Sequence, residues 1–358
     1  MKIIQVISDK NVGGAGILLS HVAGALSDEH DVEILLPKNS LLIPRLPSSV
    51  RITPFPMRGG DSLSDVPRFL HYLREHPCDI LHTHAAFSAR LAGAICGIPR
   101  LYSTRHCAMG AHNTPPLYAK LYNRVTSLTV ATACAAAEEL IAEGVPKERI
   151  RVIYNGVSET KRLSSAEKRA ELKKLLLSEK DTVIGCCGRL ERVKGQDILI
   201  EAMAELVPRF PSLHLLLIGD GSQKQNLIAL AKRLDISDRV HFVGYTPTPE
   251  TYQNLFSLNV NPSRGTETSC LATSECAALG IPTVASDFGG NRECVAHEVS
   301  GLLFKSEDKA ALAAAIERAL TDTELKRLLC KGARRRYEAM FTLSHMLDGY
   351  RRLYAENS

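Results

Sequence analysis

Residues 183–195 read VIGCCGRLERVKG, a short apolar run that passes directly into a glycine-containing turn with cationic side chains. Such a run is typical of a strand buried on both faces of a parallel sheet, and ligands usually bind at the carboxyl ends of such strands. Arg189 offers a planar guanidinium and Lys194 a mobile ammonium, a pair suited to a diphosphate. An exposed loop with ordinary surface charges is the alternative, but the position at the strand end favours an anion site.

Apolar runs and amphipathic segments alternate over the whole chain. Helical patterns occupy residues 15–26, 198–206 and 223–234, with strand-like runs between such segments. Because strand, helix and strand in succession imply right-handed crossovers, we predict an α/β fold with two Rossmann-like, doubly wound parallel sheets in domains that face a cleft. The expected strands are residues 3–8, 32–36, 79–83, 100–104, 128–131, 150–154, 183–187, 213–218, 240–243, 256–260, 282–286 and 301–304.

A polar stretch, residues 158–180, divides the strands into two series and is interpreted as the connection between the domains. We expect an N-terminal domain at residues 1–160, a C-terminal domain at 161–340 and a final helical segment at 341–358. The basic run at residues 334–336 is expected on a solvated helix face. The final segment carries one apolar helical stripe, formed by Leu343, Met346, Leu347, Tyr350, Leu353 and Tyr354.

The composition is that of an ordinary folded protein. Of 358 residues, 45% are hydrophobic and 23% are charged, and the formal net charge is +5 without a basic block. This balance fits an anionic ligand and gives no support for nucleic-acid binding, which needs a concentrated basic face. Ten cysteines without C-x-x-C or zinc spacing favour reduced thiols in a reducing compartment. With no signal peptide and no long apolar segment, we expect a cytoplasmic protein without a membrane span.

A glycine cluster follows the first expected strand and opens the first expected helix. Gly13 and Gly14 would let a ligand approach the backbone, and the N–H groups of the helix start would attract an anion. A tight strand-to-helix turn explains the same residues. The dinucleotide fingerprint G-x-G-x-x-G is not met, because Gly16 is followed three positions later by Leu19.

Two carboxylates, Glu267 and Glu275, are separated by seven residues around the start of an expected helix at 271–279. The carboxylates can hold sugar hydroxyls, while the backbone N–H groups of Ser269, Cys270 and Leu271 can hold anionic oxygens. A nucleotide sugar carries both kinds of group. For an isolated pair, one capping Glu and one solvated Glu would be the ordinary interpretation.

Together these features resemble the retaining GT-B glycosyltransferases of family 4 (glycosyl transferases group 1), over nearly the whole chain and most strongly between residues 151 and 304. Any one motif is common, but the ordered set is specific. The motifs are VIYNGV at 152–157, GRLERVKG at 188–195, LIGDG at 217–221, VHFVG at 240–244, the segment from Glu267 to Glu275, and GIPTVASDFGG at 280–290.

The resemblance implies a donor nucleotide sugar in the C-terminal domain, an acceptor in the N-terminal domain and a last helix that returns to the N-terminal domain. It implies that Arg189 and Lys194 hold the diphosphate, Glu275 the ribose and Glu267 the transferred sugar, with His106 near the donor phosphate and sugar. The implied catalytic residues are His106, Arg189, Lys194 and Glu267. The implied donor-binding residues are Gly13, Gly14, Arg189, Lys194, Gly219, Gly244, Glu267, Ser269, Cys270, Leu271 and Glu275.

Two differences from related sequences bear on the chemistry. Thr268 and Ser269 stand where the family commonly has Gly and Phe, which changes the sugar pocket and leaves the donor open. No D-x-D occurs, so the resemblance implies a metal-independent hexosyltransferase that needs no cofactor. Charge on the leaving diphosphate would be met by Arg189, Lys194 and helix N-termini. Retention of anomeric configuration is implied by the resemblance alone.

Several alternatives stay open at this point. A catalytically silent GT-B subunit would keep the fold but lose some of the four charged residues. An NAD-dependent Rossmann enzyme is disfavoured by the failed fingerprint, although Asp31 and Glu33 lie near the expected acidic position. The acceptor is a glycan, a lipid-linked or a small-molecule hydroxyl, as in cell-surface polysaccharide, lipopolysaccharide or glycoconjugate synthesis. Residues 117–124 mix aromatic and cationic side chains, which suits either contact with an anionic membrane at its inner face or buried helix packing.

Overall fold

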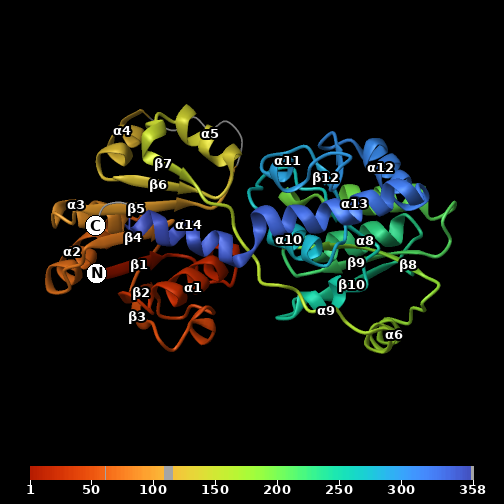
Figure 1. The fold of residues 1–358 in the computed structure, drawn as a ribbon, viewed down its shortest axis with the longest axis horizontal. Coiled ribbons are helices and arrows are strands. Elements are labelled where there is room, and N and C mark those ends of the chain that lie inside the picture. The colour runs from red at the N-terminus through yellow and green to blue at the C-terminus, as the bar shows by residue number, and fades with distance from the viewer. Residues whose placement is uncertain (61, 109–115, 356–358) are drawn as a thin grey trace. The chain divides into compact units, whose positions relative to one another are not determined.

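The computed structural model describes residues 1–60, 62–108 and 116–355, of which 116–118 are described by their backbone alone. The chain forms two compact units: unit 1 consists of Met1–Asn155 and Ser344–Ser358, and unit 2 of Gly156–Leu343. Each unit is built on one parallel sheet, with seven strands in unit 1 and six in unit 2 (Figure 1).

The sheet of unit 1 has the strand order β3-β2-β1-β4-β5-β6-β7. Sequence patterning missed the edge strand β3, because Pro54 interrupts its apolar run and a proline is tolerated only where no ladder partner needs its N–H. The strands are β1 (Lys2–Ile7), β2 (Asp31–Pro37), β3 (Arg51–Phe55), β4 (Ile80–His84), β5 (Arg100–Arg105), β6 (Leu128–Ala131) and β7 (Ile150–Val152). The helices are α1 (Gly14–Leu26), α2 (Val66–Glu75), α3 (Phe87–Ile95), α4 (Pro116–Arg124), α5 (Cys134–Ala142) and α14 (Leu343–Ala355).

The two faces of the unit 1 sheet differ in character. On one face, β1, β4 and β5 contribute Ile4, Leu81 and Leu101 to an apolar core. The next residue along β4, His82, points to the other face because side chains alternate along a strand. There it meets the buried apolar stripe of α14, and its Nδ1 lies 2.5 Å from the hydroxyl of Tyr354. The final helix is thus part of the core of unit 1 (Figure 1).

The sheet of unit 2 has the order β10-β9-β8-β11-β12-β13. Alternating residues of β8 and β9 enter two different cores: Ile184 and Leu215 on one face, Val183 and Leu216 on the other. The strands are β8 (Thr182–Cys187), β9 (Leu213–Ile218), β10 (Val240–Gly244), β11 (Leu258–Asn261), β12 (Thr283–Ser286) and β13 (Gly301–Phe304). The helices are α6 (Ser165–Lys174), α7 (Gln196–Leu206), α8 (Lys224–Arg233), α9 (Pro249–Gln253), α10 (Leu271–Ala278), α11 (Asn291–Cys294), α12 (Lys309–Thr321) and α13 (Thr323–Arg336).

The strand order reverses once in each sheet, between β1 and β4 in unit 1 and between β8 and β11 in unit 2. At such a point the connections on either side run in opposite directions, which leaves a crevice at the carboxyl ends of the two strands. The sequence VIGCCGRLERVKG forms β8 and the loop that follows it. That loop therefore lies at the reversal point of unit 2.

The polar stretch at residues 158–180 lies entirely within unit 2. Its helix α6 begins with a capping box in which Ser164 and Glu167 exchange hydrogen bonds. Leu172 and Leu177 are buried in the core beneath β8 and β9, and the backbone N–H of Leu163 donates to Asn254 Oδ1 at 2.9 Å. The apolar residues among the charges dock this stretch onto the domain.

The expectation of a solvated basic face at residues 334–336 was wrong for two of the three arginines. Arg334 pairs with Glu159 and Glu338, and Arg336 donates to the backbone carbonyls of Glu293 and Cys294. These partners belong to other parts of the chain or to the next helical turn, which a run of like charges does not reveal.

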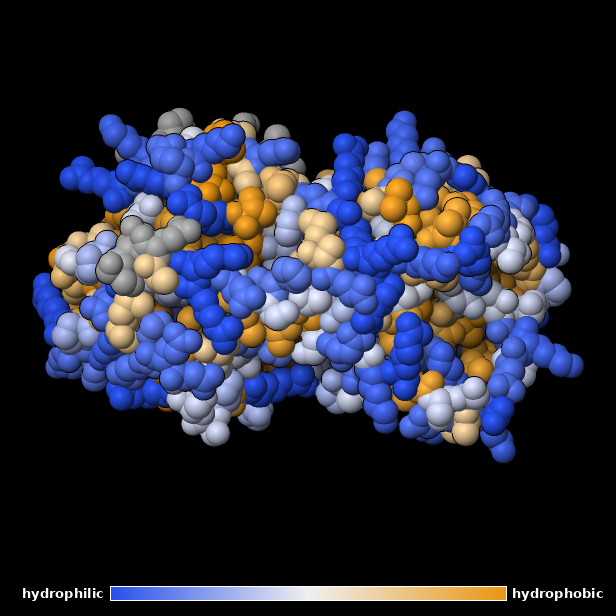
Figure 2. Space-filling view, in the orientation of Figure 1, coloured by the Kyte–Doolittle hydropathy of each residue, from blue (hydrophilic) through white to orange (hydrophobic). Residues whose placement is uncertain are grey.

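Hydrophilic residues cover most of the visible surface (Figure 2). All ten cysteines are free. None of the described helices combines the length and the apolar character that crossing a bilayer requires.

Candidate active site

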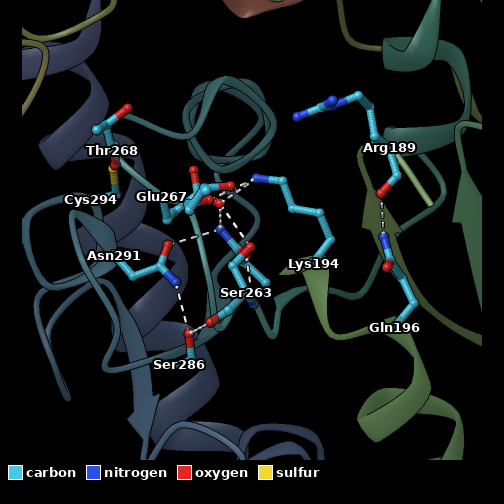
Figure 3. A network of polar contacts seen from close by, with 11 residues as sticks. Arg189, Lys194, Gln196, Ser263, Glu267, Thr268, Ser286, Asn291 and Cys294 are labelled. Atoms are coloured by element: carbon cyan, nitrogen blue, oxygen red, sulfur yellow. Dashed lines mark hydrogen bonds and ion pairs between the residues drawn. The ribbon is translucent and has the colours of Figure 1, made fainter. Parts of the chain in front are cut away.

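A pocket lies at the strand-order reversal of unit 2. It encloses about 280 Å³, part of it open to solvent, and is lined by the ends of β8 and β11 together with three predicted residues, Lys194, Glu267 and Cys270. The expected site edge thus contains a cavity with a cation and a carboxylate in its wall (Figure 3).

Lys194 reaches this pocket from a 3₁₀ turn, Arg192–Lys194, that follows β8. The next residue, Gly195, has φ +68°, and a Cβ there would lie 2.1 Å from the carbonyl oxygen of Pro262. Only glycine allows the loop to pass this close. Lys194 Nζ lies 2.9 Å from Glu267 Oε2. Burial would lower the pKa of Lys194, but the nearby Glu267 carboxylate outweighs burial, so that the pKa is raised.

Glu267 lies in the loop between β11 and α10 and is 6% exposed. Two glycines make room for this loop: a Cβ on Gly290 would lie 2.2 Å from the carbonyl oxygen of Thr268, and Gly289 has φ +54°. Besides Lys194, Glu267 Oε2 lies 2.8 Å from Ser263 Oγ and 3.4 Å from Asn261 Nδ2. The carboxylate is therefore fixed in position before any ligand binds.

Arg189 is exposed, and its guanidinium makes no ion pair within the described part of the chain. Its backbone is held in place, because its carbonyl oxygen accepts a hydrogen bond from Gln196 Nε2 at 2.9 Å. Figure 3 shows its side chain on the same side of the loop as the Lys194 ammonium. The positive charge of Arg189 is close enough to oppose protonation of Lys194. Two cations thus lie near each other, and one has no anionic partner among the described residues.

Helix α10 begins at Leu271 directly after Cys270, as predicted. Glu275 lies on this helix and accepts a hydrogen bond from Gln253 Nε2 at 2.6 Å. Burial raises the pKa of Glu275, and the Gln253 hydrogen bond partly opposes this shift. Ser269, Leu271 and Glu275 do not line the pocket, although they flank Cys270 on the same loop and helix.

The predicted glycines at the ends of β9 and β10 pair with each other. The backbone N–H of Gly219 donates to the carbonyl of Gly244 at 2.8 Å, and both glycines have positive φ, +131° and +83°. Such conformations are strained for other residues. Neither glycine lines the described pocket.

Unit 1 carries three clustered histidines at the carboxyl ends of β4 and β5, of which His82 and His84 are buried and His106 is half-buried. His84 Nδ1 lies 2.8 Å from Nε2 of the predicted His106, and His82 Nε2 lies 2.8 Å from Thr104 Oγ1. Burial lowers the pKa of His82 to about 3 and of His106 to about 4, and it lowers that of His84 well below its usual value. His106 is therefore neutral near pH 7. Among the described residues no group of acidic, histidine and cysteine side chains is arranged to hold a metal ion.

The glycine cluster of unit 1 lies at the start of α1. Gly13 precedes the helix in an extended conformation, and Gly14 is the first helical residue. Upstream, Asp9 Oδ1 accepts a hydrogen bond from the backbone N–H of Asn11 at 2.9 Å, which shapes the turn. A donor contact at Gly13 and Gly14 stays a prediction.

Sequence reasoning gave no role to the neutral side chains around Glu267. Asn261 and Ser263 stand in the sequence directly after a predicted strand, which was a usable signal. Ser286 is the last residue of the next strand, β12, and Asn291 opens the helix after it; the sequence gave no signal for either residue. Sheet register brings them to the same place (Figure 3).

Comparisons with known proteins agree with this architecture. Residues 12–161 match the family described as Glycosyltransferase Family 4, and residues 167–336 match Glycosyl transferases group 1. HepE of Anabaena, solved in complex with UDP-glucose, superposes with a TM-score of 0.85 at 23% identity, covering 99% of this chain and 100% of HepE. This likeness confirms the predicted GT-B fold.

Two curated proteins are also similar in sequence. The Bacillus subtilis protein YtcC is 30% identical over 60% of this chain and 57% of its own length. The D-inositol 3-phosphate glycosyltransferase of Jonesia denitrificans is 32% identical over 55% of this chain and 49% of its own length. The matched part therefore spans roughly half the length of these relatives.

Proposed function

Because this chain belongs to the GT-B glycosyltransferases of group 1, family 4, we propose that it transfers a sugar from a nucleoside diphosphate sugar to a hydroxyl group. The observation that carries the proposal is the pocket of unit 2, where Lys194 Nζ and Glu267 Oε2 lie 2.9 Å apart. Arg189 is exposed on the same loop as Lys194 and does not itself line the pocket. A protein that binds a nucleotide sugar needs cations to bind the diphosphate and a carboxylate to accept hydrogen bonds from the sugar hydroxyls.

The proposed chemistry follows from where charge develops. Breaking the bond between the sugar and the phosphate places negative charge on the leaving diphosphate and positive charge on the sugar ring. Arg189 and Lys194 stabilise the first charge more in the transition state than in the ground state, which is the condition for catalysis. The first-turn N–H groups of α10 would contribute in the same sense. We further propose that Glu275 holds the ribose and that the neutral His106 takes part in the reaction.

For the donor, we propose a UDP-hexose. Support comes from the fold shared with HepE, which was solved with UDP and with UDP-glucose. Thr268 and Ser269 are both buried beside Glu267, where they would shape the space for the sugar. The nearly neutral pocket wall supplied by cysteines and asparagines adds no further charge, which suits an uncharged hexose.

For the acceptor, we propose the hydroxyl of a glycan, lipid-linked or small-molecule acceptor bound by unit 1. Residues 117–124 could contact a membrane, but packing against the rest of unit 1 is the alternative explanation for their aromatic and cationic side chains. Tyr122 points inward, with its hydroxyl 2.7 Å from Ser103 Oγ and its ring 4.5 Å from the Arg90 guanidinium carbon. The side chains of Leu117 and Tyr118 lie outside the described residues. Sedimentation with anionic liposomes at low salt tests the contact, because screening weakens it at high salt.

A panel of sugar nucleotides decides the function. Purified protein is incubated with UDP-, GDP- and ADP-hexoses, and release of the nucleoside diphosphate is measured with and without candidate acceptors. We expect turnover with one nucleotide, and the anomeric proton of the product, followed by NMR, should show retention. Binding of a nucleoside diphosphate without any turnover would identify a silent binding subunit. Binding of NAD alone would overturn the proposal.

A further inference from the structure

Four buried polar side chains behind Glu267 form a closed ring of hydrogen bonds. Asn261 Nδ2 donates to Asn291 Oδ1 at 2.8 Å, and Asn291 Nδ2 donates to Ser286 Oγ at 3.0 Å. Ser286 Oγ donates to the backbone carbonyl of Ser263, and Ser263 Oγ lies 2.7 Å from Asn261 Oδ1. Ser263, Ser286 and Asn291 have no exposed surface and Asn261 is 7% exposed. The ring joins the ends of β11 and β12 to the first residue of α11 (Figure 3).

The direction of the ring is fixed by the backbone. The N–H of Ser263 points at Asn261 Oδ1 at 3.3 Å, so the amide of Asn261 must present its oxygen there and its NH₂ group to Asn291. Asn291 must then accept with its oxygen and donate with its nitrogen to Ser286. The single proton of the Ser263 hydroxyl has two acceptors, Asn261 Oδ1 and Glu267 Oε2, and the backbone N–H of Ser263 keeps the ring closed when the hydroxyl donates to Glu267. The Asn261 amide is thus held at its oxygen by Ser263 and at its nitrogen by Asn291.

The ring contacts only one oxygen of the Glu267 carboxylate. Oε2 lies within hydrogen-bond distance of Asn261, Ser263 and Lys194. Oε1 accepts no hydrogen bond within the described part of the chain and is not among the buried unpaired atoms there. Because the contacts at Oε2 fix the orientation of the carboxylate, Oε1 is left available to accept a hydrogen bond from a ligand in the pocket.

Of the three groups at Oε2, Lys194 is the one whose contact a ligand would share. A diphosphate at Arg189 and Lys194 draws on the charge of the ammonium and weakens its hold on Glu267. Asn261 and Ser263 are neutral and buried, so they keep their contacts when the diphosphate binds.

We infer that Asn291 is a positioning residue, which through Asn261 holds the Glu267 carboxylate aimed at the donor sugar once Lys194 is engaged by the diphosphate. This inference rests on the proposed function, because it assigns the sugar to Glu267. It separates two tasks in one pocket: the cations bind the diphosphate, and the ring orients the group that meets the sugar.

The test compares ligands with and without the sugar. We measure the dissociation constants of UDP and UDP-glucose, or of the matching pair that the wild type prefers in the panel above, together with kcat and KM. For Asn291→Ala we expect the affinity for the bare diphosphate to change less than about twofold. We expect kcat with the sugar nucleotide to fall about tenfold or more, since loosening Asn261, which contacts the charged Glu267, and a small misplacement of that carboxylate have effects of this order.

Asn291→Asp keeps the size of the side chain and serves if the alanine variant does not fold. An ionised Asp cannot donate to Ser286, whereas a protonated Asp can, so the ring is restored at low pH. We expect kcat of this variant, relative to the wild type at the same pH, to rise as the pH falls. The matched control is Asn254→Ala, which removes another buried amide, one that donates to the carbonyls of Lys161 and Glu250. It should lower thermal stability to a similar degree without lowering kcat.

The outcomes are separable. Parallel weakening of the bare diphosphate and the sugar nucleotide, or an unchanged kcat in both Asn291 variants, would overturn the inference while the proposed function stands. A wild-type protein that turns over no sugar nucleotide would overturn both.

Discussion

The ammonium of Lys194 lies 2.9 Å from the carboxylate of Glu267, and both side chains are largely buried in the wall of the same pocket. Burial alone would lower the pKa of Lys194, but the carboxylate more than compensates, so the ammonium stays charged. The pair keeps a cation protonated where an anionic ligand is expected to bind. Replacing either Lys194 or Glu267 should therefore change both ligand binding and the electrostatic environment of the remaining residue.

Replacing Lys194 by alanine should nearly abolish turnover while unit 2 stays folded. Loss of one such charge-stabilising group lowers kcat by roughly 10²–10³. Glu267 keeps Ser263 and Asn261, which limits the loss of stability. The control is Lys309→Ala, which removes an equally short contact, 3.0 Å to Glu205, on the exposed surface. Steady-state rates and circular dichroism check the pair of variants, and normal activity of Lys194→Ala would contradict the assignment.

Glu267→Gln should change the pH dependence of the reaction as well as its rate. Without the carboxylate, burial and the charge of Arg189 lower the pKa of Lys194 with only Cys270 acting against them, so the ammonium loses its proton at a lower pH than in the wild type. The alkaline limb of the kcat/KM profile should move toward neutral pH. An alkaline limb at the wild-type position would show that Lys194 does not need Glu267 to stay charged.

Arg189→Ala should weaken binding of the nucleoside diphosphate without loss of stability, because the guanidinium has no ion-pair partner among the described residues. Arg189→Lys should recover only part of the affinity, since a lysine cannot form the two parallel hydrogen bonds of a guanidinium. Calorimetry with the diphosphate and thermal melts give both quantities. Arg327→Ala, which removes a surface pair with Glu324, is the control for charge alone. Equal affinity in all the variants would remove Arg189 from the site.

The histidine cluster of unit 1 predicts a loss of stability in acid. The pKa of His82 is lowered to about 3 and that of His106 to about 4, whereas both titrate near 6.5 in the unfolded chain. As the pH falls from about 6.5 toward 4, the unfolded state takes up protons that the folded state does not, so the free energy of unfolding decreases over this window. Above about pH 7 these groups contribute no pH dependence.

Urea unfolding between pH 7 and pH 5 measures this effect. His82→Gln should reduce the slope of unfolding free energy against pH, because one of the unequal titrations is removed. His71→Gln serves as the control, since His71 is an exposed histidine on α2. A slope unchanged by His82→Gln would show that the acid sensitivity arises elsewhere.

Most strands could be predicted because they are short apolar runs, and the central ones are buried on both faces, whereas β7 and β10 are partly exposed. The edge strand β3 could not be predicted, since Pro54 lies within it and its residues are half exposed. Helix α14 was evident from its apolar stripe, and its burial of Tyr350 and Tyr354 explains why the stripe is aromatic. The hydrophobic periodicity of a strand, two residues, and that of a helix, between three and four residues, are local features of the sequence. They can therefore be recognised without knowledge of the fold.

The sequence alone determined the positions of all strands except β3, the loop that carries Arg189 and Lys194, and the carboxylates that follow β11. Strand ends and turns depend on neighbouring residues, which is why they could be located. Only the tertiary structure decided that Lys194 is paired with Glu267, that Asn291 supports Asn261, and that His106 is half-buried and neutral. These relationships join residues that are far apart in the chain, and they arise from strand register and burial. Neither strand register nor burial can be recognised from the spacing of neighbouring residues.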